Sequence, residues 1–261
     1  MSRLNPVLCC VVMLAGADPR PSGASGSPAA PPPGDTAWVD TGAEAQGGRA
    51  FVAWPRERGP APAVLVLHEW WGVDAHIREV ARRIAGQGYL AIVPDLYHGE
   101  VAIDPARARA LKDALDPAQA FAQLDATVAW LRRQPGSARS RVGVVGFCMG
   151  GGLAERYALR GSRLEAVVMF YGSPETDPAK LAALTAPFQG HFGAEDKGIP
   201  LAQVAALRAG LARAGHPAQV YVYPGAGHAF MHEGNETWRP DASRQAWARM
   251  LGFLQQHLKG H

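Results

Sequence analysis

The stretch RVGVVGFCMG, residues 141–150, decides the fold, because an apolar run leads directly into a cysteine flanked by glycines. Val142 to Val145 suits a buried strand, and the residues after Gly150 are compatible with a helix. A cysteine between them lies at a sharp strand-to-helix turn, the geometry of a nucleophile elbow. The flanking glycines remove steric clashes, and the helix directs its positive end at the sulfur. The pattern alone leaves two interpretations equally open, a reactive thiol at Cys148 or a buried, inert cysteine, and other residues must decide between them.

The composition is that of a soluble globular protein. The chain has 261 residues, of which 48% are hydrophobic and 19% charged, and this length suits one α/β domain. The formal net charge is +3, but lysine and arginine are scattered and no run of them is interleaved with aromatic residues. We therefore expect no nucleic-acid partner.

The N-terminus is typical of an exported protein. Arg3 precedes an apolar run, Val7 to Leu14, and small residues follow at the spacing of a signal-peptidase site. The run is too short to span a bilayer, which takes about 20 apolar residues. Residues 1–17 are therefore predicted to be a signal peptide without stable membrane insertion, directing the protein to the periplasm or outside the cell. The alternative is a cytoplasmic protein with a mildly apolar N-terminus.

The next segment, residues 18–36, is rich in proline, glycine and serine and predicts a flexible linker ahead of a domain spanning residues 37–261. Cleavage after Ala17 would remove Cys9 and Cys10 and leave Cys148 as the only thiol. An intramolecular disulfide would then be impossible. A lone thiol in an oxidising compartment indicates either chemistry or deep burial.

Predicted strands and helices alternate along the domain. Asp104-Pro105 and Asp116-Pro117 each have the pattern of a helix N-cap followed by proline at the first helical position. Such alternation predicts an α/β fold with a mostly parallel central sheet and helices on both faces. The predicted elements are a hairpin of 37–40 with 49–54, strands at 63–67, 89–93, 142–145, 164–170, 187–192 and 219–223, and helices at 74–87, from 104, from 116 to 133 and at 240–257.

Reactive side chains follow several of these strands. Because ligands of open α/β sheets bind at the carboxyl ends of the strands, these side chains are expected to gather at one edge. Cys148, Asp196 and His228 occur in the order nucleophile, acid, histidine that α/β-hydrolases use. An imidazole can take the thiol proton, and a carboxylate can orient the imidazole. Glu195 could serve in place of Asp196.

Five sequence blocks, in order, resemble the dienelactone hydrolase family over the chain from about Ala37 to the C-terminus. They are LHEWWG at 67–72, PDLY at 94–97, GFCMGG at 146–151, HFG at 191–193 with Asp196 and Pro200, and YPGAGHAF at 223–230. The resemblance implies an α/β-hydrolase fold without a cofactor and a triad of Cys148, Asp196 and His228.

The resemblance also assigns Glu69 and two backbone groups. In the family, a glutamate at this position holds the resting thiol and helps to convert it to thiolate when substrate arrives. A carboxylate beside a thiol disfavours the thiolate, which would protect the resting enzyme. By the same analogy, the backbone N–H groups of Met149 and Trp70 form the oxyanion hole.

Two positions depart from the family pattern. Characterised members bind the substrate carboxylate with arginines at the positions that are Gly99 and His232 here. Neither residue supplies the permanently charged fork of arginine, so dienelactone itself is not the expected substrate. An aromatic pocket is expected instead. Its expected lining residues are Trp70, Trp71, Tyr97, Phe147 and Phe230, together with His232.

The sequence therefore predicts a hydrolase of small-molecule esters or lactones that acts through a thioester, as a monomer or homodimer. Thiolate is a good leaving group, so esters should react in preference to amides. The main alternative is a non-catalytic binding or carrier protein on the same fold. A metal site from His191, His228 and His232 lacks the spacing of known metal motifs, and none is predicted.

Overall fold

The computed structural model describes residues 34–42, 48–57, 59–134 and 137–260. The predicted signal peptide and most of the linker lie outside these ranges and stay predictions. The predicted domain start at residue 37 lies one residue inside the first described strand, which begins at Thr36.

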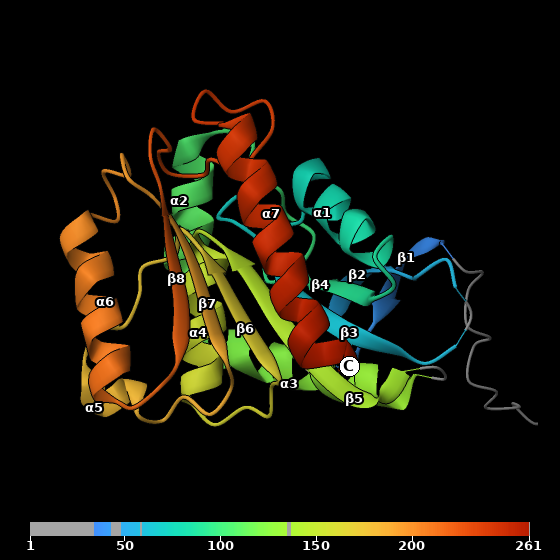
Figure 1. Ribbon diagram of the computed structural model, residues 1–261. Helices are drawn as coiled ribbons and strands as arrows, with labels where there is room; N and C mark the ends of the chain where they lie inside the picture. Colours follow the sequence, from blue (N-terminus) through green and yellow to red (C-terminus); the bar gives the residue numbers. More distant parts are fainter. Residues whose placement is uncertain (1–33, 43–47, 58, 135–136, 261) are drawn as a thin grey trace, which may run out of the picture.

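Eight described strands form one sheet in the order β1-β2-β4-β3-β5-β6-β7-β8 (Figure 1). β1 and β2 pair as the expected antiparallel hairpin, β2 pairs antiparallel with β4, and every other neighbouring pair is parallel. The predicted α/β class with a mostly parallel sheet is confirmed. The strands are β1 (Thr36–Asp40), β2 (Arg49–Ala53), β3 (Ala61–Leu67), β4 (Leu90–Pro94), β5 (Ser137–Phe147), β6 (Ala166–Phe170), β7 (Phe188–Gly193) and β8 (Ala218–Tyr223).

Helices cover both faces of the sheet. α1 and α7 pack on the face toward the viewer in Figure 1, and α2, α3, α4 and α6 contribute to the core on the other face. Within the described ranges, no helix is both long and apolar enough to cross a membrane. The helices are α1 (Ala75–Ala85), α2 (Pro105–Ala114), α3 (Pro117–Arg133), α4 (Met149–Leu159), α5 (Pro178–Leu181), α6 (Leu201–Arg213), α7 (Pro240–Leu254) and the π-helix η1 (Gln255–Lys259).

The central strand β3 shows why the protein has two hydrophobic cores. All of its residues are buried. Leu65 and Leu67 belong to the core beneath α3 and α4, whereas Val64 and Val66 belong to the core beneath α1 and α7. Successive side chains of a strand point to opposite faces, so a continuous apolar run supplies both cores at once.

The predicted helix starts are confirmed by their caps. The Asp104 carboxylate accepts the backbone N–H of Arg107 at 2.8 Å, and that of Asp116 accepts the N–H of Ala118 at 2.9 Å. Each bond satisfies an N–H that has no partner within the helix. The C-terminal prediction was less accurate, because α7 ends at Leu254 and the chain continues as a π-helix.

The turn between β5 and α4 requires glycine on both sides of Cys148. Cys148 has φ 51° and ψ −115°, a left-handed conformation that costs free energy in a residue with a Cβ. A Cβ on Gly146 would lie 2.1 Å from the carbonyl oxygen of Gly150, and a Cβ on Gly150 would lie 2.4 Å from that of Leu67. The start of α4 is thus packed directly against the ends of β3 and β5.

We predict that Gly146→Ala destabilises the protein by about 1–3 kcal/mol or more, because the added methyl group forces two backbone segments apart. Gly252→Ala is the matched control, since a Cβ at this exposed position in α7 meets no atom within 4 Å. It should instead stabilise by about 0.5–1 kcal/mol through helix propensity. Urea unfolding followed by circular dichroism measures both. Equal midpoints for Gly146→Ala and the wild type would contradict the close packing.

Candidate active site

Three side chains from separate strand ends form a continuous hydrogen-bonded series. Cys148 follows β5, Asp196 follows β7 and His228 follows β8. His228 Nε2 lies 3.0 Å from Cys148 Sγ, and His228 Nδ1 lies 2.7 Å from Asp196 Oδ2. The structure thus brings together the three residues that the sequence order singled out.

Asp196, and not Glu195, is the partner of the histidine. Its side chain is buried, and its second oxygen accepts the backbone N–H groups of Gly198 and Ile199 at 2.8 and 3.0 Å. Glu195 is exposed. The carboxylate of Asp196 is therefore fixed in position by its own loop before it orients the imidazole.

The surroundings of His228 change its proton affinity. Burial lowers its pKa, but the hydrogen bonds to Asp196 and Cys148 outweigh this and raise the pKa to about 10. At neutral pH the ring therefore holds a proton on both nitrogens. One proton is shared with Asp196, and the other is directed at the cysteine sulfur.

Cys148 is held in place by its backbone. Its N–H donates to the carbonyl oxygen of Phe170 on β6 at 3.0 Å, and its own carbonyl oxygen accepts the N–H groups of Gly151 and Gly152 in the first turn of α4. The side chain is partly exposed and contributes to the cavity wall. Met149 is the first residue of α4, so its N–H falls outside the hydrogen-bonding pattern of the helix.

Glu69 follows β3 and is held by a histidine. Its side chain is 5% exposed, and Oε2 lies 3.0 Å from Nδ1 of His232. That hydrogen bond raises the pKa of His232 despite partial burial. His76 stacks on the far side of His232 with ring centroids 4.0 Å apart. Burial, together with the charge of His232, lowers the pKa of His76, so a proton on this pair of rings is held by His232 in preference to His76.

Tyr171 completes this side of the site. It follows β6, has φ 37° and lies edge-on to the His228 ring at 5.3 Å between centroids. Among the described residues, its hydroxyl and Oε1 of Glu69 are buried and outside any hydrogen bond of standard geometry. Burial, and then the nearby Glu69 and Cys148, raise the pKa of Tyr171 well above its usual value. The phenol is therefore neutral at physiological pH.

These residues surround a cavity of about 580 Å³. Trp70 and Trp71 form one part of its wall, with ring centroids 5.1 Å apart. The remaining lining residues are Glu69, Lys112, Cys148, Met149, Gly152, Arg156, Tyr171, Ser173, Gly198, Ile199, His228, Ala229, Asn235 and Thr237.

Of the residues expected to form an aromatic lining, only Trp70 and Trp71 contribute to the cavity wall. Phe147 and Phe230 are fully buried in the core beneath α1 and α7, and Phe147 stacks on Phe170 at 4.8 Å. Tyr97 is buried on the other face, where its hydroxyl donates to the sulfur of Met149 at 3.2 Å. His232 lies behind Glu69 instead of on the wall. Phe147 ends β5 and points into the core, and the loops that carry Tyr97 and Phe230 bury their rings through packing that proximity in sequence does not reveal.

Other polar residues at strand ends have structural roles. His68 is fully buried, and its Nδ1 contacts the carbonyl oxygen of Glu69 at 2.6 Å. Asp95 accepts the N–H of Tyr97 in a turn. His191 uses both ring nitrogens, on Tyr223 and Gln189. Within the described ranges, no three His, Cys, Asp or Glu side chains are grouped closely enough to hold a metal ion.

The sequence reasoning did not identify Tyr171, Lys112, Arg156 or His76. Tyr171 directly follows β6, so the rule that located Cys148 could have located it. Arg156 lies eight residues after Cys148 on α4, and positions 148, 152 and 156 share one stripe of a helix. Lys112 and His76 carry no local signal of this kind, because only the folded chain brings them to the site.

Comparisons with known proteins agree with this geometry. The model of the dienelactone hydrolase family matches residues 49–258. A protein of Escherichia coli named "putative carboxymethylenebutenolidase" is 35% identical over 223 residues, which are 80% of this chain and 82% of the relative. A "probable 2-oxo-3-(5-oxofuran-2-ylidene)propanoate lactonase" of Bradyrhizobium is 30% identical over 85% of this chain and 95% of its own length.

A solved structure gives the same result. The crystal structure titled "putative dienelactone hydrolase" from Klebsiella pneumoniae has a TM-score of 0.78 and 32% sequence identity, and the match covers 85% of this chain and 98% of that one.

We predict that His228 titrates with a midpoint near pH 10, as measured by ¹⁵N NMR of labelled histidine. Asp196→Asn should lower the midpoint toward the ordinary value of about 6.5, because the neutral amide stabilises the imidazolium less. Glu195→Gln is the matched control and should leave it unchanged, since this neighbour is exposed. A wild-type midpoint near the ordinary value would contradict the proton placement.

Proposed function

Since the chain belongs to the dienelactone hydrolase family and is a hydrolase of esters or lactones, we propose that Cys148 is its nucleophile, His228 its general acid and base, and Asp196 the group that orients the histidine. The observation that carries this proposal is the unbroken series of contacts from Sγ through the imidazole to the buried carboxylate. Such a series is the arrangement by which nucleophile and base act as a unit.

In the first half of the reaction, Cys148 attacks the carbonyl carbon of the substrate as the thiolate, paired with the doubly protonated ring of His228. A C–S bond forms, and the carbonyl π electrons move to oxygen. The resulting oxyanion would accept hydrogen bonds from the backbone N–H groups of Met149 and Trp70, both of which line the cavity. The C–O bond to the leaving group then breaks, and the departing oxygen takes the Nε2 proton of His228.

In the second half, His228 acts as a base. A water molecule loses a proton to Nε2 and attacks the thioester carbon, and the C–S bond breaks to return the sulfur to its starting state. The product is a free acid, together with the alcohol released earlier. From a lactone, both groups remain in one molecule, because the ring oxygen stays attached to the acyl chain.

Dienelactone itself is not the substrate that we propose. The positions of the family's two carboxylate-binding arginines are Gly99, which has φ 99° in a turn, and His232, whose Nδ1 is engaged by Glu69. Neither residue contributes to the described cavity wall. An ester or lactone of other shape, with a leaving group better than an amine, fits the remaining site.

We predict that Cys148→Ala lowers kcat/KM for 4-nitrophenyl acetate by on the order of 10³-fold or more, because the acyl group no longer has an acceptor. Mass spectrometry of the quenched wild-type reaction should find the acetyl group on the peptide that contains Cys148. Thermal unfolding of the variant provides the folding control. Turnover equal to that of the wild type would refute the nucleophile, and absence of turnover in both would favour the carrier alternative.

We propose that Glu69 lowers the reactivity of resting Cys148 and that His232 raises it. A carboxylate near sulfur disfavours the anionic sulfur, and His232, whose pKa is raised by its hydrogen bond to Glu69, offsets the effect when it is protonated. Glu69→Gln should therefore speed alkylation of Cys148 by iodoacetamide at pH 7, whereas His232→Gln should slow it. Rates are measured by mass spectrometry. A change of the same sign in both variants would indicate a packing disturbance and contradict the charge argument.

A further inference from the structure

We propose that the cavity contains a subsite for an acidic group, formed by Arg156 of α4 and Lys112 of α2 with the hydroxyl of Ser173, and that the preferred esters or lactones carry a carboxylate. The proposal rests on the hydrolase function given above and names its substrate class. It places the anion on a different wall from Gly99 and His232. All three residues line the cavity to which Cys148 also contributes.

Arg156 lies along the first turns of α4 and extends toward the nucleophile. Its two terminal guanidinium nitrogens are 3.6 and 3.7 Å from the point that a Cβ on Gly152 would occupy. Long side chains of a helix lean toward its N-terminus, and the absence of a side chain at Gly152 leaves the space for this one. Gly152 is four residues after Cys148, so the guanidinium lies on the order of 6 Å along the helix axis from the cysteine.

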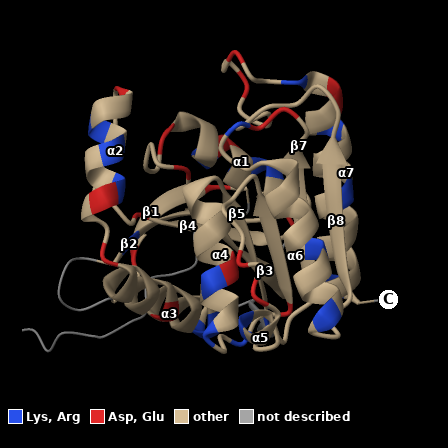
Figure 2. Cartoon of the chain, turned by 90° about the vertical axis from the view of Figure 1, so that its left-hand side faces the viewer, with Lys and Arg blue, Asp and Glu red and all other residues tan. Residues whose placement is uncertain are grey.

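Both side chains are exposed, and neither cation forms an ion pair with a described residue. The ion pairs of that part of the chain involve other basic side chains, including Arg160, which pairs with Asp125 one turn further along α4. Basic residues appear on both α2 and α4 in Figure 2. Two uncompensated cations at the wall of one cavity favour an anionic ligand.

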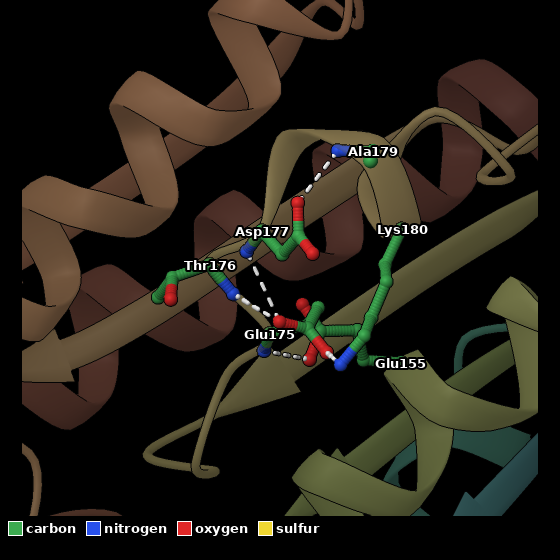
Figure 3. Close-up of polar contacts among 6 residues, drawn as sticks. All are labelled: Glu155, Glu175, Thr176, Asp177, Ala179 and Lys180. Carbon is green, nitrogen blue, oxygen red and sulfur yellow. Dashed lines mark hydrogen bonds and ion pairs between the residues drawn. The ribbon is translucent and has the colours of Figure 1, made fainter.

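The carboxyl group adjacent in sequence to Arg156 is engaged elsewhere. Glu155 is buried and points away from solvent, and its Oε2 accepts the backbone N–H of Glu175 at 2.7 Å (Figure 3). Burial is the main reason that its pKa rises to about 8, so this carboxyl is mostly uncharged at neutral pH. Glu175 in turn pairs with Lys180 at 3.0 Å. Arg156 interacts with Glu155 electrostatically, lowering the pKa of that carboxyl, but forms no ion pair with it, so the guanidinium can still bind a ligand.

Glu69 is the only acidic residue among the described lining residues, and it does not pair with Arg156 or Lys112. Glu69 is held by His232, and its free oxygen is buried. The guanidinium of Arg156 can therefore donate two parallel hydrogen bonds to a carboxylate of the substrate. The substrate would bind through two groups, its reactive carbonyl at Cys148 and its carboxylate at Arg156. A short aliphatic chain in the substrate would join these two groups.

The test compares an anionic ester, mono-(4-nitrophenyl) adipate, with its neutral methyl ester, which has the same acyl chain and leaving group and one added methyl group, with uncatalysed hydrolysis subtracted. The wild type should prefer the anionic ester in kcat/KM. Arg156→Gln should lower kcat/KM for that ester by roughly tenfold, mainly through KM, and leave the neutral ester within about twofold. Arg160→Gln is the matched control, because it removes an equal charge outside the cavity, and it should change neither rate.

The outcomes separate the subsite from the hydrolase function. Equal losses for both esters in Arg156→Gln, or no charge preference in the wild type, would overturn the subsite while Cys148-dependent turnover stands. If no ester is turned over, the hydrolase function fails, and calorimetry with adipate still tests the subsite. Weaker adipate binding by Arg156→Gln than by Arg160→Gln supports it, and equal binding refutes it.

Discussion

The close contact between the start of α4 and the ends of β3 and β5 is the constraint on which the rest of this protein depends. The carbonyl oxygens of Leu67 and Gly150 occupy the space that side chains on Gly150 and Gly146 would need. The chain therefore turns from strand to helix within one residue, and Cys148 takes a left-handed backbone conformation. The sulfur is consequently held at the sheet edge, where the loops after β3, β7 and β8 meet it.

Two acidic side chains act on the surroundings of this sulfur. Asp196 raises the pKa of His228, which contacts the sulfur, whereas Glu69 lines the same cavity and is held by His232, on which His76 stacks. Under the proposed function, the two acids favour different states of the thiol, and each acid is itself held by a partner. A ligand that shifts Glu69 or displaces water would then change the reactivity of the thiol.

The cavity differs from the apolar pocket that aromatic residues in the sequence suggest. Phe147, Phe230 and Tyr97 strengthen the two cores beneath the site, and the wall that they leave open is formed by the two tryptophans, Tyr171 and two cations. This division has a physical reason: fully apolar rings are stabilised most by complete burial, whereas amphipathic side chains can remain at the surface of a cavity.

The sequence by itself determined the α/β class, the position of the elbow and the order of Cys148, Asp196 and His228, because hydrophobic periodicity, glycine spacing and helix caps such as Asp104 are local in the chain. It could not distinguish the aromatic side chains that are buried in the cores from those that line the cavity. It also did not identify Tyr171, His76, Lys112 or Arg156. Only the tertiary structure decided these, since orientation and proximity arise from strand alternation and from the packing of helices distant in sequence. The pairing of Glu69 with His232, which are 163 residues apart, is of this second kind, because no local pattern encodes a contact that forms only when the sheet and its loops are assembled.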